Sequence, residues 1–503
     1  MASRSRHSNP QLLPQLLARA LGAGVDQVAP LPAVPVTGIA QDHRRVKPGD
    51  LFVARIGARF DAHDYLDEVI GAGAVAVVGS KRELAGDTTL AVPYLFVPDD
   101  RLALARLSAS FHGNPSQQLW VAGVTGTDGK TTVSYLLHHL LGGFVSSGLL
   151  STAGVRIGER TLPGEGRFTT PEASEVQALL RDFVDGGCTH AVVETSSHAL
   201  AMHRVTGTEY DVAVWTNLTP EHLDYHGSFG EYREAKLGLI RAAPVAVLNA
   251  DDPEYETFRR AAPGRVVSYG LGQEAQVRAI AMEEQQAGLR FEVLWEDERV
   301  TVEAPLVGEF NVYNVLAALA AARLLLPEGS GAGLAQLAGR LRDFPGVPGR
   351  MQLVQASPFK VIVDFAHTGP ALEKVLQVLR PGTPGRIILV VGAAGERDPG
   401  KRGPLGRAAA RGADLLYFTE EDHRSEPIEE ILGQLQQAAL EAGAAPEAVH
   451  LVADRSDAIA AALAQARAGD TVLLAGKGHE ATLERGDRSL PWNEVEEARK
   501  HLT

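Results

Sequence analysis

Short apolar runs that end in glycine or polar residues recur along the chain and predict buried β-strands. In the first hundred residues the runs are LFVAR (51–55) and GAVAVVG (73–79). A second series consists of LWVAGVTG (119–126), HAVVET (190–195), DVAVWTN (211–217) and VAVLNAD (245–251). Helical segments lie between these runs, and strands that alternate with helices favour a parallel sheet covered on both faces.

A third series of strand-like runs fills the last part of the chain. An Ala/Leu helix at 312–326 and the loop PEGSGAG precede it, and we expect the new unit to begin near Pro345. Its runs are VIVDFAH (361–367), IILVVGAAG (387–395), ADLLYFTE (413–420) and DTVLLAGKG (470–478). Because the carboxyl ends of parallel strands share one edge of a sheet, the polar motifs that follow these runs are expected to converge there.

The length and the apolar content agree with several buried cores. At about 150 residues per domain, 503 residues with 45% apolar content suggest three domains. We therefore predict an α/β protein with a small amino-terminal α/β domain at 1–104, a central parallel-sheet domain at 105–345 and a Rossmann-like domain at 346–503.

Charge and cysteine content exclude several classes of protein. The formal net charge of −14, from 48 basic and 62 acidic residues, disfavours nucleic acid as a partner. The single cysteine, Cys188, cannot form an internal disulfide, which argues against an oxidised secreted scaffold. The first residues, MASRSRHSNP, lack the apolar core of a signal peptide, and no window has about 18 uninterrupted apolar residues. We expect a cytoplasmic protein without membrane insertion.

The segment GVTGTDGKTT (123–132) predicts a phosphate-binding loop. It follows a strand-like run and precedes the helical pattern VSYLLHHLL. Such a turn directs backbone N–H groups and a helix amino terminus at phosphates, while Lys130 adds a positive charge and Thr131 can ligate Mg²⁺. The spacing departs from the commonest pattern because Val124 stands where that pattern has glycine. A chance glycine turn is the alternative, and ATP binding is our hypothesis.

Two further polar clusters follow strands of the central region. VVETSSH (192–198) places Glu194 at a strand end, and NLTPEHLDYHG (217–227) supplies His222. Carboxylate and hydroxyl oxygens suit Mg²⁺. A histidine ligand to Mg²⁺ is unusual, and by itself His222 or His226 indicates a hydrogen-bonding or capping residue. Lys236, in EYREAKLGLI, reads by itself as an exposed helical lysine.

Taken together, these motifs resemble the Mur ligase family, the ATP-dependent amide-forming enzymes of peptidoglycan and cell wall synthesis, over nearly the whole chain. The family's loop GTxGKT is matched here, with Asp128 where asparagine is usual. The central domain would then be the P-loop ATPase domain. The resemblance assigns ATP binding to Gly123, Thr125, Gly126, Thr127, Asp128, Gly129, Lys130, Thr131, Thr132, Asn311, Asn314, Arg350 and Asp364.

The resemblance also implies a magnesium site and a modified lysine. It assigns Lys130, Glu194, His222 and Lys236 to catalysis, and Thr131, Glu194, His222 and Lys236 to Mg²⁺. Lys236 would react with CO₂ to give a carbamate, which replaces a cation with an anionic oxygen ligand. This chemistry is reasonable because a desolvated, neutral lysine amine is nucleophilic.

The amino-terminal domain resembles the MurE branch of the family, which adds the third residue of the stem peptide to UDP-MurNAc-L-Ala-D-Glu. The match of this domain rests on DHRRVKPGDLFVARIG (42–57) and AHDYLDEVIGAGAVAVV (62–78). FTTPE (168–172), in the central region, resembles the segment of the branch that grips the muramoyl dipeptide. His43 stands where the branch usually has serine, and imidazole can also donate or accept a hydrogen bond. The implied contacts to this substrate are Gln41, His43, Ala58, Arg59, Phe60, Thr169, Thr170, Ser196, Met202 and Arg204.

The carboxyl-terminal domain matches the branch through GERDPGKRGP (395–404), EDHRSEP (421–427) and GKGHE (476–480). Enzymes that choose meso-diaminopimelate typically have DNPR where this chain has EDHR. The acids Glu420, Glu421 and Asp422 beside Arg424 favour a distal ammonium, hence L-lysine or L-ornithine. The alternative is that these acids cap the following helix. The implied amino-acid contacts are Arg397, Glu421, Asp422, His423, Arg424, Gly476 and Glu480.

The resemblance implies a monomeric ligase that forms an acyl phosphate from ATP and the D-glutamyl carboxylate, with domain closure around the reactants. A MurF-like or folylpolyglutamate synthetase-like ligase shares the central domain and is the first alternative. A catalytically silent sensor of cell-wall precursors is the second, and the presence of Lys130, Glu194 and Lys236 argues against it.

Overall fold

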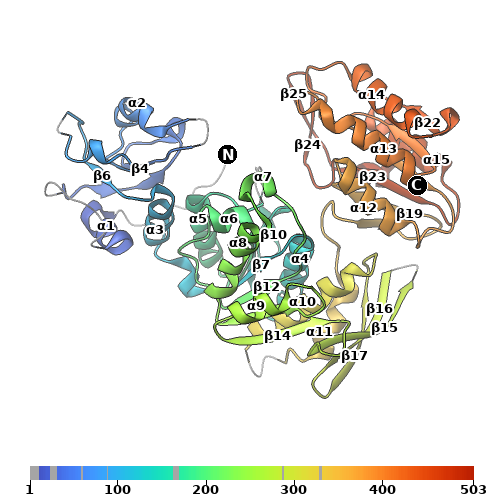
Figure 1. Cartoon of the computed structure of the whole chain (residues 1–503), viewed down its shortest axis with the longest axis horizontal. Helices are drawn as coiled ribbons and strands as arrows, with labels where there is room; N and C mark the ends of the chain where they lie inside the picture. The colour runs from blue at the N-terminus through green and yellow to red at the C-terminus, as the bar shows by residue number, and fades with distance from the viewer. Residues whose placement is uncertain are drawn as a thin grey trace. The chain divides into compact units, whose positions relative to one another are not determined.

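The computed structural model of the chain describes residues 11–22, 31–57, 60–87, 89–162, 169–285, 288–327 and 331–502. Figure 1 labels the helices and strands along the chain. The chain divides into two compact units. The first holds residues 1–277 and 316–333, and the second holds residues 278–315 and 334–503.

A four-stranded parallel sheet with the order β3-β4-β5-β6 forms the amino-terminal part of the first unit. Its elements are β1 (Gln11–Leu12), α1 (Leu13–Leu21), β2 (Pro35–Val36), β3 (Gly38–Ala40), β4 (Asp50–Ala54), α2 (Leu66–Gly71), β5 (Ala76–Gly79), β6 (Tyr94–Phe96) and α3 (Asp100–Phe111). From Leu51 to Ala54, β4 is a continuous apolar run, as expected for a strand buried on both faces. Leu51 and Val53 pack into one core with α1, whereas Phe52 packs into another with α2.

A larger sheet forms the rest of the first unit, with β8, β11, β7, β12, β13 and β14 parallel in that order. The β9–β10 hairpin continues the sheet beside β8. Helices α5 and α8 contribute to one core on this sheet. The elements are β7 (Trp120–Thr125), α4 (Lys130–Leu141), β8 (Ser147–Ser151), β9 (Gly154–Ile157), β10 (Arg160–Leu162), α5 (Ala173–Asp185), β11 (His190–Glu194), α6 (Ser197–Ala201), β12 (Val212–Trp215), α7 (Leu223–His226), α8 (Phe229–Ala242), β13 (Val245–Asn249), α9 (Tyr255–Ala261) and β14 (Arg265–Gly270).

The second unit contains an antiparallel segment that the apolar runs did not predict. It comprises β15 (Val277–Gln285), β16 (Gly288–Trp295) and β17 (Glu298–Ala304), followed by α10 (Phe310–Leu325) and α11 (Leu334–Arg340). The residues of α10 are shared between the two units. From Val315 to Ala322 every side chain of this helix is fully buried, which explains why its sequence is apolar on all faces.

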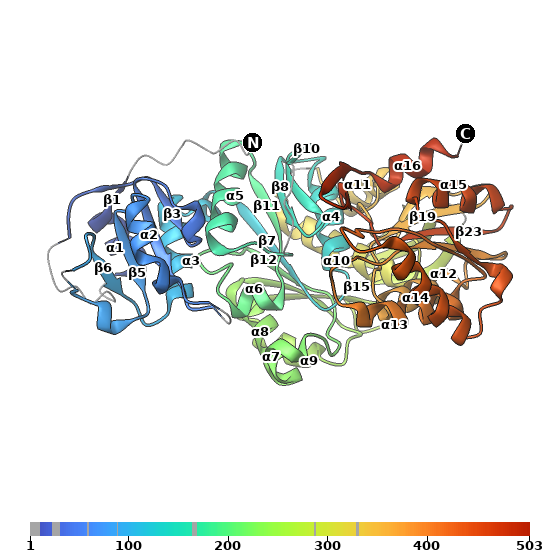
Figure 2. The same cartoon turned by 90° about the horizontal axis from the view of Figure 1, so that it is seen from above.

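The carboxyl-terminal sheet has the order β18-β19-β23-β20-β21-β22, and only β18 runs antiparallel to its neighbour. Helices α12, α13 and α14 cover one face, and α15 and α16 cover the other (Figure 2). The elements are β18 (Gln352–Gln355), β19 (Lys360–Asp364), α12 (Gly369–Leu379), β20 (Ile387–Val391), α13 (Arg402–Gly412), β21 (Leu415–Phe418), α14 (Ile428–Glu441), β22 (Val449–Leu451), α15 (Arg455–Gln465), β23 (Thr471–Ala475), β24 (Thr482–Arg485), β25 (Arg488–Pro491) and α16 (Glu494–Lys500).

The predicted α/β class with parallel sheets is confirmed, and each predicted apolar run contains a strand. The predicted boundary after residue 104 falls inside α3, and the proposed domain limits remain predictions. Within the described ranges, no helix combines the length and the apolar character needed to cross a membrane.

Candidate active site

The loop between β7 and α4 has the backbone of a phosphate cradle. Gly126 and Gly129 have φ angles of 150° and 85°, which disfavour residues with a Cβ atom. A Cβ on Gly126 would also lie 1.8 Å from Oγ1 of Thr216. Lys130 begins α4 and donates to the carbonyls of Gly126, at 3.0 Å, and Thr127, at 2.7 Å. The loop therefore places backbone N–H groups and a lysine at a helix amino terminus.

The other predicted loop residues occupy the same strand–loop–helix segment. Asp128 is fixed by Asn217, whose side-chain oxygen accepts from the Asp128 N–H at 2.9 Å. The hydroxyl oxygen of Thr125 is buried without a hydrogen-bond partner. Gly123 lies in β7, where a Cβ would come within 2.7 Å of the Tyr210 ring, and Thr132 lies in the first turn of α4.

Glu194, at the end of β11, is held by hydroxyl and backbone donors. Its carboxylate accepts from the Thr131 hydroxyl at 2.9 Å and from the Ser151 hydroxyl at 2.5 Å. The N–H and hydroxyl of Thr152 donate to it at 2.9 and 3.0 Å. The carboxylate is thus oriented next to the first turn of α4. Sequence reasoning found Thr131 but missed Ser151, which ends β8, and Thr152, which follows it, because it did not identify this strand.

Lys236 is buried in α8 with 1% of its surface exposed, contrary to the exposed helical lysine that its local sequence suggests. Its Nζ donates to the carbonyl of Gly126 at 2.5 Å, so two lysines share this one acceptor. Burial, and next the charge of Lys130, lower the pKa of Lys236 well below its usual value. The arrangement favours a neutral, nucleophilic amine beside the loop.

Tyr232 connects Lys236 to the loop and was not predicted. Its ring lies 4.6 Å from the Lys236 Nζ, and its hydroxyl lies 3.0 Å from the Thr127 hydroxyl. The Thr127 hydroxyl also donates to the Thr219 carbonyl at 3.1 Å. Tyr232 is fully buried, so it fixes the lysine and the loop in one packed cluster.

His222 precedes α7 with a left-handed backbone, at φ 55°, and its side chain is 46% exposed. Its ring lies 4.8 Å from that of His198, and its Nε2 lies 3.6 Å from the Glu221 carboxylate. Among the residues that the structure describes, no three His, Cys, Asp or Glu side chains form a group that could hold a metal. The structure therefore brings Thr131 and Glu194 into contact. His222 contacts His198 and Glu221 instead.

The predicted uridine-nucleotide contacts include a stack of flat rings. His43 stacks on Tyr65 with ring centroids 4.0 Å apart and planes at 11°, and Phe60 meets Tyr65 edge-on at 6.4 Å. Gln41 donates to the Ser174 hydroxyl at 3.4 Å, while its Oε1 is buried without a partner. Tyr65 was missed because a tyrosine after a turn carries no specific signal. Ala58 and Arg59 lie outside the described residues.

The predicted dipeptide contacts gather around Thr170. Its hydroxyl donates to the Glu194 carbonyl at 2.8 Å and lies 3.4 Å from the Ser196 hydroxyl. Arg204 donates to the Thr170 carbonyl at 3.1 Å. The structure thus joins three of the predicted residues to the Glu194 strand end. Thr169 precedes Thr170 on the same loop, and Met202 follows the last turn of α6.

A charge triad links this group to the amino-terminal sheet. Glu172 accepts from Arg204 at 2.9 Å and from Arg55, just after β4, also at 2.9 Å. Arg55 was not predicted, because nothing in its local sequence marks an arginine that pairs with a carboxylate 117 residues away. The triad makes Arg55 a candidate for orienting Arg204.

Four predicted ATP contacts belong to the second unit. Asn314 donates to the side-chain oxygen of Asn311 at 2.8 Å, and Asn311 donates to the Val307 carbonyl at 2.8 Å. Asp364 accepts from the N–H groups of Met351, at 2.7 Å, and Ala366, at 2.9 Å, while burial raises the pKa of its carboxyl. Arg350 lies over the Phe365 ring, 5.2 Å from its centroid.

The predicted amino-acid contacts Glu421, Asp422, Gly476 and Glu480 lie on two loops that follow β21 and β23. Glu421 is 8% exposed, and its Oε2 is buried without a hydrogen-bond partner. Burial raises the pKa of Glu421 to about 7. Gly476 permits this close packing, since a Cβ there would lie 3.2 Å from the Glu421 Oε2. The loops also bring Lys477, which was not predicted, to 2.8 Å from Asp422 and 2.7 Å from Glu480.

The prediction that three acids surround Arg424 is wrong in part. Only Asp422 lies within ion-pair distance of it, at 4.0 Å, and Arg424 donates to the Gly395 carbonyl at 2.6 Å. Glu420 instead pairs with Arg485, because the β24–β25 hairpin delivers that arginine to the strand end. The capping alternative is not seen either, since Pro427 precedes α14 and no side chain caps this helix.

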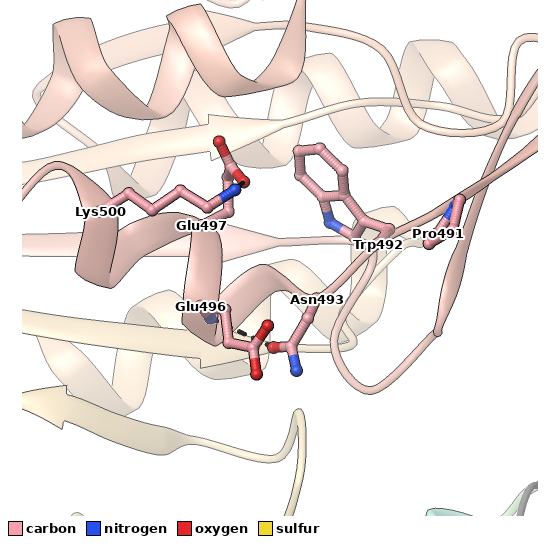
Figure 3. Close-up of a pocket in the computed structure, with 6 residues that line it drawn as sticks. All are labelled: Pro491, Trp492, Asn493, Glu496, Glu497 and Lys500. Atoms are coloured by element: carbon pink, nitrogen blue, oxygen red, sulfur yellow. Dashed lines mark hydrogen bonds and ion pairs between the residues drawn. The ribbon is translucent and has the colours of Figure 1, made fainter.

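The remaining predicted residues of this region lie at its margin. The side chain of His423 is 21% exposed, and its Nδ1 lies 3.2 Å from the Glu426 carbonyl. Arg397 is exposed on the loop that follows β20. A separate hollow beside α16 contains none of the predicted site residues; its lining is Pro491, Trp492, Asn493, Glu496, Glu497 and Lys500 (Figure 3).

Two family models and several known proteins match most of the chain. The sequence profile of the Mur ligase middle domain matches residues 124–322, and that of the Mur ligase, glutamate ligase domain matches residues 349–478. The chain is 47% identical over 493 residues to the UDP-N-acetylmuramyl-tripeptide synthetase of Deinococcus radiodurans, covering 97% of this chain and 98% of that protein.

Other relatives have names that specify the amino acid. The UDP-N-acetylmuramoyl-L-alanyl-D-glutamate–2,6-diaminopimelate ligase of Geobacillus thermodenitrificans is 38% identical over 476 residues, which are 92% of this chain and 94% of that protein. A solved structure of a ligase with the same name has a TM-score of 0.68 and 30% identity, and the match covers 97% of this chain and 98% of that chain.

Proposed function

Because the chain belongs to the Mur ligase family, we propose that it is an ATP-dependent ligase that adds the third amino acid to UDP-MurNAc-L-Ala-D-Glu in peptidoglycan synthesis. The proposal depends mainly on two hydrogen bonds to the Gly126 carbonyl. Lys130 donates one from the amino terminus of α4, and the buried Lys236 donates the other. The loop between β7 and α4 thus has a positive charge that can bind phosphate, on Lys130, and a nucleophilic amine, on Lys236. Relatives named as tripeptide synthetases support the substrate.

The first step is phosphoryl transfer. An oxygen of the D-glutamyl carboxylate attacks the γ-phosphorus of ATP, the bond to the β,γ-bridging oxygen breaks, and ADP leaves with that electron pair. Lys130, at the start of α4, would neutralise charge on the transferring group together with loop N–H groups. The product is an acyl phosphate.

The second step forms the amide. The α-amine of the incoming amino acid attacks the acyl carbon, a tetrahedral species collapses, and inorganic phosphate leaves while the nitrogen loses a proton. Positioning supplies much of the rate of such a reaction, because two bound reactants are held in near-attack geometry.

The residues beside the loop fit Mg²⁺ by the chemistry of their donors. The Thr131 hydroxyl and the Glu194 carboxylate, 2.9 Å apart, are hard oxygen donors, and Mg²⁺ usually takes one or two such ligands besides water and substrate phosphates. A bound Mg²⁺ would supply charge neutralisation at the phosphates. The assignment of His222 to this metal rests on the family resemblance.

Lys236 fits the proposed carbamate. A neutral amine attacks CO₂, a C–N bond forms, and the nitrogen loses one proton to leave an anionic carbamate. Burial and the neighbouring charge of Lys130 favour the neutral amine that this reaction needs. Modification would also replace the amine that now shares the Gly126 carbonyl with Lys130.

We propose a basic amino acid without a distal carboxylate, L-lysine or L-ornithine, as the substrate rather than meso-diaminopimelate. Glu421 offers a buried carboxylate oxygen without a partner, which suits an ammonium group. Arg424, the residue that would bind a distal carboxylate, directs one nitrogen to the Gly395 carbonyl and another toward Asp422. The nearby Asp422 carboxylate would also repel a distal carboxylate.

Release of inorganic phosphate tests the function. The protein is incubated with ATP, Mg²⁺, UDP-MurNAc-L-Ala-D-Glu and, in turn, L-ornithine, L-lysine and meso-diaminopimelate. We expect sustained release only in the full mixture and the highest kcat/KM with one of the two basic amino acids. Release that is independent of the amino acid would contradict the proposed reaction, and preference for meso-diaminopimelate would contradict the proposed substrate.

A further inference from the structure

Lys477, which directly follows Gly476 after β23, is buried with none of its surface exposed. Its ammonium group donates to the Asp422 carboxylate at 2.8 Å and to the Glu480 carboxylate at 2.7 Å. The two acids come from different loops, one after β21 and one after β23. A single buried cation therefore neutralises two of the acids in the proposed amino-acid site.

The carboxylates of Asp422 and Glu420 each accept hydrogen bonds from at least two protein donors. Asp422 accepts from the N–H of Glu484 at 3.0 Å in addition to Lys477. Glu420 accepts from Arg485 at 2.7 Å and from the N–H of Arg455 at 3.1 Å. Since buried charges are costly unless they are paired, these contacts commit both acids to protein partners.

Glu421 differs from these three acids. Of the four carboxylates, it alone has a buried oxygen without a hydrogen-bond partner. It packs against Gly476, the neighbour of Lys477. Burial raises its pKa to about 7, and the charges of Arg455 and Lys477 offset only part of that shift. A cation bound at the oxygen without a partner would favour the ionised carboxylate.

We propose that Lys477 is a positioning residue that determines specificity: by pairing with Asp422 and Glu480, it leaves the buried Oε2 of Glu421 as the acceptor for the distal ammonium of the incoming diamino acid. The inference rests on the proposed function and deepens it. A single carboxylate at a fixed position in the site can pair only with the ammonium group of a side chain of matching length. Three available acids at different positions would accept ammonium groups on side chains of different lengths. Lys477 thereby makes the site selective between L-ornithine and L-lysine.

The test compares kcat/KM for L-ornithine and L-lysine by phosphate release with saturating ATP and UDP-MurNAc-L-Ala-D-Glu. We expect the wild type to prefer one of them by about 10-fold or more, as one methylene in a fitted site allows. Lys477→Met should bring the ratio to within about threefold of one, because Asp422 and Glu480 become additional acceptors. The KM for ATP should stay unchanged.

A triple variant and a single variant keep the test decisive if Lys477→Met fails to fold. Asp422→Asn, Lys477→Met and Glu480→Gln together remove the cation and both acids that it pairs while keeping Glu421, so the wild-type ratio should survive. Glu421→Gln should raise the KM for both diamino acids and abolish the preference between them.

Lys500→Met is the matched control. Lys500 pairs with Glu497 at 2.5 Å, also three residues away, but on the exposed side of α16 (Figure 3). Its removal should leave the ornithine-to-lysine ratio as in the wild type. Three results would overturn the role of Lys477. They are a wild type that uses L-ornithine and L-lysine equally well, a Lys477→Met variant that keeps the wild-type preference, and a triple variant that loses this preference. A wild type that uses none of the amino acids would overturn the proposed function itself.

Discussion

The buried carboxyl of Glu421 makes the stability of the protein depend on pH in a defined direction. Burial raises its pKa from 4.5 to about 7. Between these values the folded state holds a proton that the unfolded state has released. The stability contributed by this group is therefore fully present below pH 4.5 and is lost as the pH rises to about 7.

Replacing Glu421 with glutamine removes this dependence, because an amide of the same shape does not ionise. A shift of about 2.5 units at ~1.4 kcal/mol per unit gives on the order of 3 kcal/mol. The variant should thus match the wild type near pH 4.5 and exceed its free energy of unfolding by that amount above pH 7. For a unit of about 200 residues, the melting temperature should rise by roughly 6–12 °C.

Differential scanning calorimetry between pH 4.5 and 8.5 measures the effect, with Glu447→Gln as the control on an exposed carboxylate. The difference in melting temperature between variant and wild type should grow with pH for Glu421→Gln and stay near zero for the control. A difference that is constant with pH, or a variant that is less stable at alkaline pH, would refute the reasoning. L-ornithine or L-lysine should stabilise the wild type more than the variant.

Three further substitutions test the other parts of the site. Gly126→Ala places a Cβ against the Thr216 hydroxyl, and isothermal titration should show at least a tenfold loss of ATP affinity, about 1.4 kcal/mol. Arg55→Met frees Glu172 from one of its two arginines, so steady-state kinetics should show a higher KM for the UDP-dipeptide with an unchanged KM for ATP. Lys236→Ala should lower kcat by about 100-fold or more, and added short-chain carboxylates should restore part of this activity. A variant that is not rescued, together with a wild type that is fully active in CO₂-free buffer, would contradict the carbamate.

The sequence predicted the phosphate loop well because all of its information is local. A strand, three glycines, Lys130 and a helix follow each other directly, and β7, the loop and α4 form as expected. The parallel strands were equally readable, since a strand buried on both faces is a continuous apolar run. β20, for instance, is fully buried from Ile387 to Val391.

The antiparallel strands β15–β17 escaped prediction for a physical reason. Their residues alternate between buried and exposed positions, as in β17 from Glu298 to Ala304, so no uninterrupted apolar run marks them. Short strands such as β9 and β10 carry even less signal, because they are only partly buried.

The missed residues of the site have partners that are distant in sequence. Lys477 meets an aspartate 55 residues earlier, and Arg55 meets a glutamate 117 residues later. Whether a lysine is buried between two acids is decided by how two loops pack, which local patterns do not encode. The same reason explains why the acids near Arg424 were assigned to the wrong partner, since Arg485 arrives from the β24–β25 hairpin.

In the proposed reaction, the D-glutamyl carboxylate is activated by direct attack on the γ-phosphorus of ATP. The most direct test uses UDP-MurNAc-L-Ala-D-Glu with ¹⁸O in both oxygens of the γ-carboxylate, followed by mass spectrometry of the released phosphate. We predict that one ¹⁸O atom appears in each phosphate that accompanies an amide product. Phosphate without ¹⁸O, alongside normal amide formation, would contradict the proposed chemistry.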